Sequence, residues 1–227
     1  MCRTEQAEKA IEKAKEEGDE EAVEKFSKRN MRVTPEMTAD VKKMLRMMGV
    51  PVIEAPTEAE AQCAELCKKG LVYAAVSEDM DTLTFGAPVM LRNVFMPESR
   101  KLPILEISLN KVLAGLELTL DQFVDLCILM GCDYCGTVKG IGPKTAQTLV
   151  QKHGSMEKVI ANINLEKHPL PDPFNHEEIH NFFISPEVTD AKQLEADGLM
   201  TWKECDEEAF VHFMVKEKQF DEKRIMG

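Results

Sequence analysis

The sequence lacks any long run of uncharged apolar residues. No stretch approaches the about 20 residues that a membrane-spanning helix needs, and the N-terminus has no apolar run of the secretory type. We therefore expect a soluble, intracellular protein with no membrane partner, provided that no targeting segment lies outside this sequence. With 227 residues, 44% of them hydrophobic, the chain is long enough to bury one good core.

Positive charge is also scarce. The chain has 28 Lys and Arg against 40 Asp and Glu, which gives a net charge of −12 and argues against a nucleic-acid binder. The distribution changes this interpretation, because residues 164–227 alone hold fifteen acidic against seven basic side chains. Between Tyr134 and Met156 no acidic residue occurs, and Lys139, Lys144 and Lys152 make that segment locally basic. An acidic protein can still bind phosphate there.

The sequence has no complete set of paired cysteine or histidine residues at the spacing of a zinc site. The seven cysteines are an odd number, which favours reduced thiols in the cytosol or nucleus. Cys132-x-x-Cys135 has no second pair at zinc-ribbon spacing, so zinc is the less favoured interpretation. His176 and His180 share a helix face, but the acidic residues between them favour a solvated surface.

Helix and strand signals alternate in the first half of the chain. Residues 4–29 read as two solvated helices broken at Gly18-Asp19, and Thr34-Pro35 begins a helix that ends at Gly49. A second helix begins at Thr57 with a capping-box pattern and ends at Gly70. Strands are expected at four apolar stretches: 50–55, 71–76, 88–94 and 102–107. This order predicts an α/β fold with a mostly parallel sheet.

From Ser108 onward the signals are helical. Thr119-x-x-Gln122 caps a helix that presents Phe123, Leu126, Cys127 and Met130 to a core. The chain is thus predicted to pair an α/β core with a helical subdomain.

Acidic residues follow two of the expected strands. Glu58 and Glu60 come after strand 50–55, and Asp79 and Asp81 after strand 71–76. Ligands collect beyond the carboxyl ends of parallel strands, and residues two apart in an extended segment project to the same side. Asp133, after the helix at 120–130, is a fifth candidate. Oxygen ligands favour Mg²⁺ or Mn²⁺, and two such ions can activate water against a phosphodiester.

Purely structural roles for these acids stay open at this point. Glu60 can be the reciprocal capping partner of Thr57, and Glu58 a favourable charge at a helix N-terminus. They converge only if Glu58 lies before the first regular turn of the helix. Asp133 can be an ordinary turn residue.

A glycine-containing turn lies inside the basic segment. In Gly140-Ile141-Gly142-Pro143-Lys144, proline suits the first helical position and the glycines let backbone N–H groups approach a ligand. A helix N-terminus beside a lysine can bind a phosphate of the DNA backbone regardless of sequence. The alternative is an ordinary helical turn with a solvated lysine.

Taken together, these motifs resemble the flap endonuclease family in order and spacing along essentially the whole chain. The segments that carry the resemblance are Ala55–Ala61, Glu78–Asp81, Leu83–Gly86, Gln122–Leu129, Gly131–Cys135 and Gly140–Lys144. The family cuts 5′ flaps in DNA replication and repair with two divalent metal ions. The resemblance therefore implies a PIN-like nuclease core followed by a helix–two-turn–helix subdomain.

The resemblance also implies roles for individual residues. Glu58, Glu60, Asp79, Asp81 and Asp133 become catalytic metal ligands for two Mg²⁺ ions, with Mn²⁺ as a substitute. Lys139, Gly140, Gly142 and Lys144 become DNA-binding residues in the two-turn segment. A potassium ion is expected at Thr137, Val138 and Ile141, where threonine replaces the more usual serine. Branched or flapped double-stranded DNA is the implied substrate, and the nucleus, with mitochondria as an alternative, the implied location.

The implied domains are a helical arm at 1–33, a nuclease core at 34–118 and a helical DNA-binding subdomain with its extension at 119–227. Relative to the family, the chain is expected to lack the N-terminal segment, with further carboxylates, and the C-terminal tail, with the sliding-clamp peptide. We therefore expect weak metal binding and little nuclease activity from the chain alone. The alternative is a non-catalytic DNA-junction binding module, which would have no need of four acids at two strand ends.

Overall fold

The structure is a computed structural model that describes residues 33–226, so the predicted helical arm at 4–29 lies outside the described residues. The chain divides into two compact units. One combines the chain up to Val52 with the chain from Thr201 onward, and the other comprises Ile53–Met200. The predicted boundaries at 33/34 and 118/119 stay predictions. In the described residues no helix is long and apolar enough to cross a membrane.

The smaller unit is built on helix α3 (Pro35–Met47) and the C-terminal helices α12 (Glu207–Val211), η2 (His212–Glu217, a π-helix) and α13 (Glu222–Met226). Thr34 caps α3 as predicted, because its Oγ1 accepts a hydrogen bond from Met37 N at 3.2 Å. Lys43 of α3 forms an ion pair with Glu217 at 2.9 Å and lies 4.4 Å from the centre of the Phe213 ring. These contacts join the two ends of the described chain.

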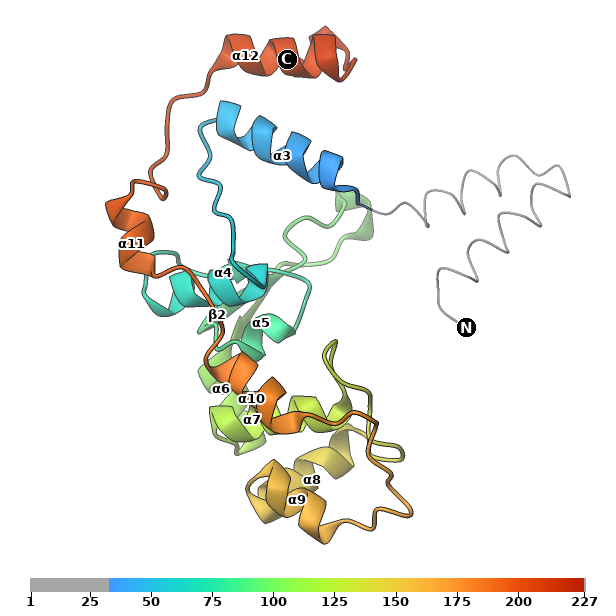
Figure 1. Ribbon diagram of the computed structural model, residues 1–227. Helices are drawn as coiled ribbons and strands as arrows, with labels where there is room; N and C mark the ends of the chain where they lie inside the picture. Colours follow the sequence, from blue (N-terminus) through green and yellow to red (C-terminus); the bar gives the residue numbers. More distant parts are fainter. Residues whose placement is uncertain (1–32, 227) are drawn as a thin grey trace, which may run out of the picture. The chain divides into compact units, whose positions relative to one another are not determined.

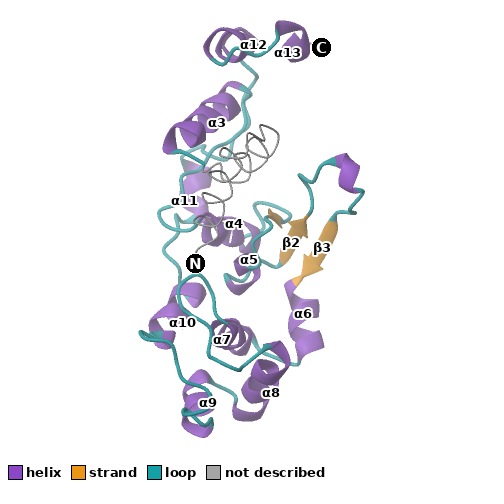
Figure 2. Ribbon diagram, turned by 90° about the vertical axis from the view of Figure 1, so that its right-hand side faces the viewer, coloured by secondary structure: helices purple, strands orange, loops and turns teal. Residues whose placement is uncertain are grey.

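The larger unit contains a small sheet with the order β1-β2-β3. Strand β1 (Ala75–Val76) pairs parallel with β2 (Val89–Arg92), and β2 pairs antiparallel with β3 (Leu105–Ser108). Figure 2 shows β3 running directly into helix α6 (Leu109–Leu116), with β2 beside β3. The α/β class is confirmed, and the sheet is mixed, with one parallel and one antiparallel pairing among the described strands.

Two strand predictions need correction. Residues 50–55 form no strand, because Pro51 has no N–H to donate and the segment pairs with no described strand. The run at 71–76 is strand only at its last two residues, and it is not buried on both faces. Tyr73 is 70% exposed and its hydroxyl donates to Glu106 at 2.7 Å.

The remaining elements of this unit are short helices around one long buried helix. They are α4 (Ala59–Lys68), α5 (Asp81–Thr84), η1 (Glu98–Arg100), α7 (Leu120–Met130), α8 (Pro143–His153), α9 (Met156–Asn162), α10 (His176–Ile184) and α11 (Ala191–Ala196). Helix α7 has the capping box that the sequence predicts, with Thr119 and Gln122 bonded reciprocally. Figure 1 shows α8 and α9 beside α7, at the end of the unit away from α4.

The main hydrophobic core of this unit is built around α7, and a smaller cluster is formed by Leu66, Ala191 and Leu194. Helix α7 supplies Val124, Ile128 and Leu129, all fully buried, and Met90 of β2 and Phe183 of α10 join the main core. Because α7 contacts α5, α8, α9 and α10, it fixes the loops at both of its ends relative to the sheet. Asp133 and the glycine-containing turn follow directly from its C-terminus.

Candidate metal centre and nucleic-acid interface

The beginning of helix α4 places Glu58 and Glu60. Glu58 is the N-cap residue with an extended backbone, so α4 begins at Ala59 and Glu60 lies in its first turn. The capping-box prediction for Thr57 is wrong, because its Oγ1 donates to the Glu187 carbonyl at 2.9 Å. Glu60 is therefore not the capping partner of Thr57, and Glu58, although it is the N-cap residue, makes no side-chain cap hydrogen bond. Glu58 lies before the first regular turn, which is the condition under which the two side chains can converge.

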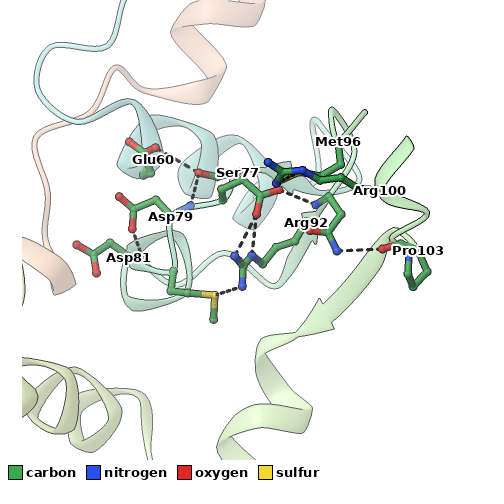
Figure 3. Close-up of polar contacts among 11 residues, drawn as sticks. Glu60, Ser77, Asp79, Asp81, Arg92, Met96, Arg100 and Pro103 are labelled. Atoms are coloured by element: carbon green, nitrogen blue, oxygen red, sulfur yellow. Dashed lines mark hydrogen bonds and ion pairs between the residues drawn. The ribbon is translucent and has the colours of Figure 1, made fainter. Parts of the chain in front are cut away.

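A turn, and not an extended strand end, orients Asp79 and Asp81. The Asp79 N–H donates to Ser77 Oγ at 3.0 Å, and the Asp81 N–H donates to Asp79 Oδ1 at 3.0 Å. Ser77 Oγ in turn donates to Glu60 Oε1 at 3.4 Å. Asp81 is the first residue of α5. Figure 3 shows the side chains of Glu60, Asp79 and Asp81 extending to the same side of this turn.

The charges of the other four predicted ligands act at Asp81. Burial raises the pKa of its carboxyl, and repulsion from the other four carboxylates raises it further, to about 6; these neighbours, in order of effect, are Asp79, Asp133, Glu60 and Glu58. A carboxylate repelled by four others is a position where a divalent cation is favoured. The five acids, drawn from three separate segments, therefore lie near enough for the other four to act electrostatically on Asp81.

These residues fit a magnesium or manganese site by their donor chemistry, which is oxygen alone. Within residues 33–226, no three His, Cys, Asp or Glu side chains already surround one point closely enough to ligate a single ion. The fit rests on this donor chemistry and on the four carboxylate charges that act at Asp81.

Glu78 precedes Asp79 in the sequence, but its side chain points away from the metal-site acids. Its Oε2 accepts hydrogen bonds from Arg92 Nε at 3.2 Å and Nη2 at 3.0 Å, and its Oε1 accepts from Asn93 N. In Figure 3, Arg92 lies on the side of the turn opposite to Asp79 and Asp81. This pair neutralises Glu78, while none of the salt bridges within residues 33–226 involves one of the five acids.

The glycine-containing turn joins α7 to α8. Gly142 is the N-cap of α8 with no side-chain cap hydrogen bond, and Pro143 is at the first helical position, as predicted. Gly140 has a φ of +76°, and a Cβ there would lie 3.1 Å from His168 Nδ1, so glycine is required by the backbone itself. Lys139 and Lys144 are exposed. The free N–H groups of α8 and two lysines thus face solvent together, and their DNA-binding role stays a prediction.

The three residues predicted to bind potassium lie in the same loop. Val138 and Ile141 are buried, and Ile141 N donates to the Val138 carbonyl at 3.2 Å. Thr137 is exposed. The buried pair anchors the turn to the core, and the ion itself stays a prediction.

Comparison with known proteins shows what the chain is related to. Residues 49–133 match the XPG I-region family, a span that contains all five acids and ends at Asp133. Flap endonuclease 1 of Chlamydomonas reinhardtii is 53% identical over 219 residues, which cover 96% of this chain and 54% of that protein. The chain is a relative of the flap endonucleases.

Solved structures agree with this relationship. The flap endonuclease-1 from Methanococcus jannaschii matches with a TM-score of 0.72 and 37% identity, over 92% of this chain and 60% of that one. The catalytic core of Rad2 in complex with DNA matches with a TM-score of 0.70 and 23% identity, over 97% of this chain and 73% of that one, which supports the fold alone. The chain spans about half the length of the curated flap endonucleases that it matches.

Sequence reasoning missed Tyr134 as a part of this flap endonuclease-like site. Its pKa is raised well above the ordinary value by burial, by the Glu58 charge and by a hydrogen bond to Glu58. Its ring packs edge-on against Phe182 at 4.8 Å and Phe183 at 5.6 Å, both from α10. Tyr134 therefore ties the loop of Asp133 to Glu58 and to the core. Its position directly after Asp133 was the available signal.

The prediction that His180 lies on a solvated surface is wrong. Its Nδ1 lies 2.8 Å from Oδ1 of Asp125, and its Nε2 lies 3.4 Å from Oδ1 of Asp121. Burial raises the pKa of Asp125, while the hydrogen bond and charge of His180 act in the opposite direction. Asp125 Oδ2 also accepts from Met156 N at 3.0 Å. The pair holds α7, α9 and α10 together.

Proposed function

We propose that this chain is the metal-binding and DNA-binding part of a structure-specific endonuclease that cuts 5′ flaps in DNA replication and repair by phosphodiester hydrolysis. The observation that carries the proposal is the Asp81 carboxyl, whose pKa is raised by burial and further by the charges of the other four acids of the set. The relationship to flap endonucleases agrees with this assignment.

Each part of the site has a task in this proposal. Glu58, Glu60, Asp79, Asp81 and Asp133 would hold two Mg²⁺ ions, with Mn²⁺ as a substitute. Ions of this kind lower the pKa of bound water and stabilise the leaving oxygen of a phosphodiester. Ser77 and the α5 N-terminus orient Asp79 and Asp81. Tyr134, whose pKa Glu58 raises, would help to position Glu58.

The turn before α8 would bind the DNA duplex at some distance from the phosphodiester bond that is cut. Backbone N–H groups at Gly140 and Gly142 and the ammonium groups of Lys139 and Lys144 suit phosphate oxygens and read no bases. A potassium ion at Thr137, Val138 and Ile141 would add positive charge at the same place. For the whole protein we also propose a sliding clamp as partner and the nucleus as location.

Binding of a fluorescent 5′-flap duplex, with and without Ca²⁺, tests the proposal. Five carboxylates repel phosphate unless cations neutralise them, so wild-type affinity should rise at least tenfold with Ca²⁺. In Asp79→Ala/Asp81→Ala the rise should be largely lost, while a Glu166→Gln control on an exposed acid keeps it. Equal affinity of the wild type with and without Ca²⁺ would contradict the metal-binding role.

Cleavage in Mg²⁺, followed on the same DNA, separates the enzyme from a non-catalytic junction binder. Any cut product from the wild type should disappear in Asp79→Ala/Asp81→Ala. Product that persists in the double variant at the wild-type rate would place the chemistry elsewhere. Metal-dependent binding of the whole protein without any cleavage would favour the junction-binding alternative.

A further inference from the structure

Two cysteines flank the loop that carries Asp133 and Tyr134. Cys132 N donates to the Cys135 carbonyl at 3.3 Å, and Cys135 N donates to the Cys132 carbonyl at 3.2 Å. The two residues thereby form an isolated antiparallel bridge. Residues bonded in this way have Cα atoms about 5.5 Å apart, which lies within the range that a disulfide spans, about 4.4–6.8 Å. The backbone is therefore already set for a disulfide.

The two sulfur atoms are also in contact. Cys132 Sγ and Cys135 Sγ lie 3.6 Å apart, and both side chains are partly accessible. Of the six cysteines in the described part of the chain, these are the two whose sulfurs contact each other. Cys67 instead contacts the carbonyls of Tyr73 and Val89, and Cys63 and Cys205 are exposed.

A structural role in packing or zinc binding explains these facts less well. Packing alone does not require two thiols in mutual contact, and a zinc site requires further ligands. Within residues 33–226, no third His, Cys, Asp or Glu completes a metal-binding group with them.

We propose that Cys132 and Cys135 form an oxidisable pair, which closes to a disulfide by exchange with a small-molecule disulfide such as oxidised glutathione and thereby weakens divalent-metal binding. The metal part rests on the function proposed above. One cysteine, as the thiolate, attacks the small disulfide, giving a mixed disulfide and one free small thiol. The second cysteine then displaces the other small thiol. Two electrons pass to the small disulfide, and the two cysteine protons end on the two released thiols.

Formation of the disulfide acts on the metal site because Asp133 and Tyr134 lie between Cys132 and Cys135 in the chain. The sulfurs must approach from 3.6 Å to about 2.05 Å. Asp133 and Tyr134 are enclosed in the resulting ring, and Tyr134 is held on its other side by Phe182, Phe183 and Glu58. The disulfide ring therefore strains those contacts, which shifts the Asp133 carboxylate or breaks the contact of Tyr134 with Glu58.

The experiment is an equilibration of the protein in glutathione redox buffers, followed by alkylation and peptide mass analysis. The exchange is followed to equilibrium, because its rate depends on the ionised fraction of each thiol. In oxidising buffer we expect the peptide with Cys132 and Cys135 to lose two hydrogen masses and to take no alkyl group at either residue. Persistent alkylation of both thiols would overturn the proposal.

Serine variants identify the pair. Cys132→Ser and Cys135→Ser should each abolish the closed form and leave a glutathione adduct on the remaining cysteine. Cys127→Ser and the exposed control Cys63→Ser should close as the wild type does. Closure that survives Cys132→Ser, or that is lost in Cys127→Ser, would assign the disulfide to another pair.

Mn²⁺ titration of the reduced and oxidised wild type tests the coupling. We expect the apparent Kd to rise at least threefold on oxidation, and to be unchanged by the oxidant in Cys132→Ser. Equal affinity of the two forms would overturn the coupling. A reduced protein that binds no Mn²⁺ would overturn the proposed function, while the mass result would still decide the disulfide.

Discussion

At the scale of single residues, Asp81 is where burial and four neighbouring carboxylates act together. Its pKa of about 6 lies above the ordinary 3.8, so the folded chain holds this proton more tightly than the unfolded chain does. As the pH rises from about 4 to about 6, the unfolded chain gives up the proton first, and stability falls. Above this window the ionised cluster lowers the free energy of unfolding unless a cation is bound.

Asp81→Asn removes this charge and should stabilise the metal-free protein. Because the side chain is only half-buried, solvent screening reduces the effect, and we expect a Tm gain of about 2–4 °C at pH 7.5 in EDTA. The gain should vanish near pH 4. Calorimetry at both pH values checks this, with the exposed Glu166→Gln as control. A lower Tm for Asp81→Asn at pH 7.5 would contradict the account.

His180 is a second residue whose role is local and structural. Removing its imidazole in His180→Ala leaves the buried Asp125 without its nearest partner. We expect a loss of about 1.5–3 kcal/mol in the free energy of unfolding, the usual range for a hydrogen bond to a charged group. Urea denaturation measures it. His176→Ala, one turn earlier on α10, is the matched control and should cost clearly less; equal losses would mean that the pair with Asp125 contributes nothing specific.

At the scale of elements, the C-terminus of α7 fixes the loop that bears Asp133. Gly131 has a φ of +94°, and a Cβ there would lie 2.5 Å from Thr137 Cγ2 and 3.0 Å from the Thr137 backbone. Gly131→Ala therefore has to strain the backbone or displace the loop, at a cost of about 1–3 kcal/mol. Gly115→Ala inside α6 meets no atom and should stabilise by about 0.5–1 kcal/mol. Thermal denaturation of both variants checks this contrast, and equal shifts would contradict it.

Helix α8 provides the test of DNA binding at this scale. Lys144→Ala, in its first turn, should weaken binding of all DNA sequences alike and reduce the slope of log affinity against log salt by about 1. Lys152→Ala, in the last turn of the same helix, is the matched control and should change both less. Anisotropy at several salt concentrations measures the slopes. A loss confined to some sequences would show base readout and contradict the assignment.

Helices were predictable from sequence where local signals determine them, and strands only in part. The strands expected at 88–94 and 102–107 are present as β2 and β3, while those at 50–55 and 71–76 needed correction. The cap at Thr34, the capping box at Thr119 and Pro143 at the start of α8 depend on neighbours within one turn. The expected strand at 50–55 and the capping role of Thr57 failed for the opposite reason. A strand needs a partner, and Thr57 bonds a carbonyl 130 residues away, which no local pattern reveals.

At the scale of the whole molecule, the distribution of charge matters more than its sum. The net charge of −12 argues against DNA binding, yet the acids of the site gather at one place and the lysines of the α7–α8 loop at another. The five acids were proposed as ligands from motif order, and their role as ligands stays a prediction. The hydrogen bonds of Ser77 and Tyr134 that hold them were not readable from the sequence, because these depend on contacts between segments far apart in the chain.

Calorimetric titration of Mn²⁺ into the wild type and into Asp79→Ala/Asp81→Ala measures the central claim, that acids from three segments bind divalent ions together. We predict a saturable heat of binding for the wild type that is lost in the double variant. Equal heats from the two proteins would contradict it.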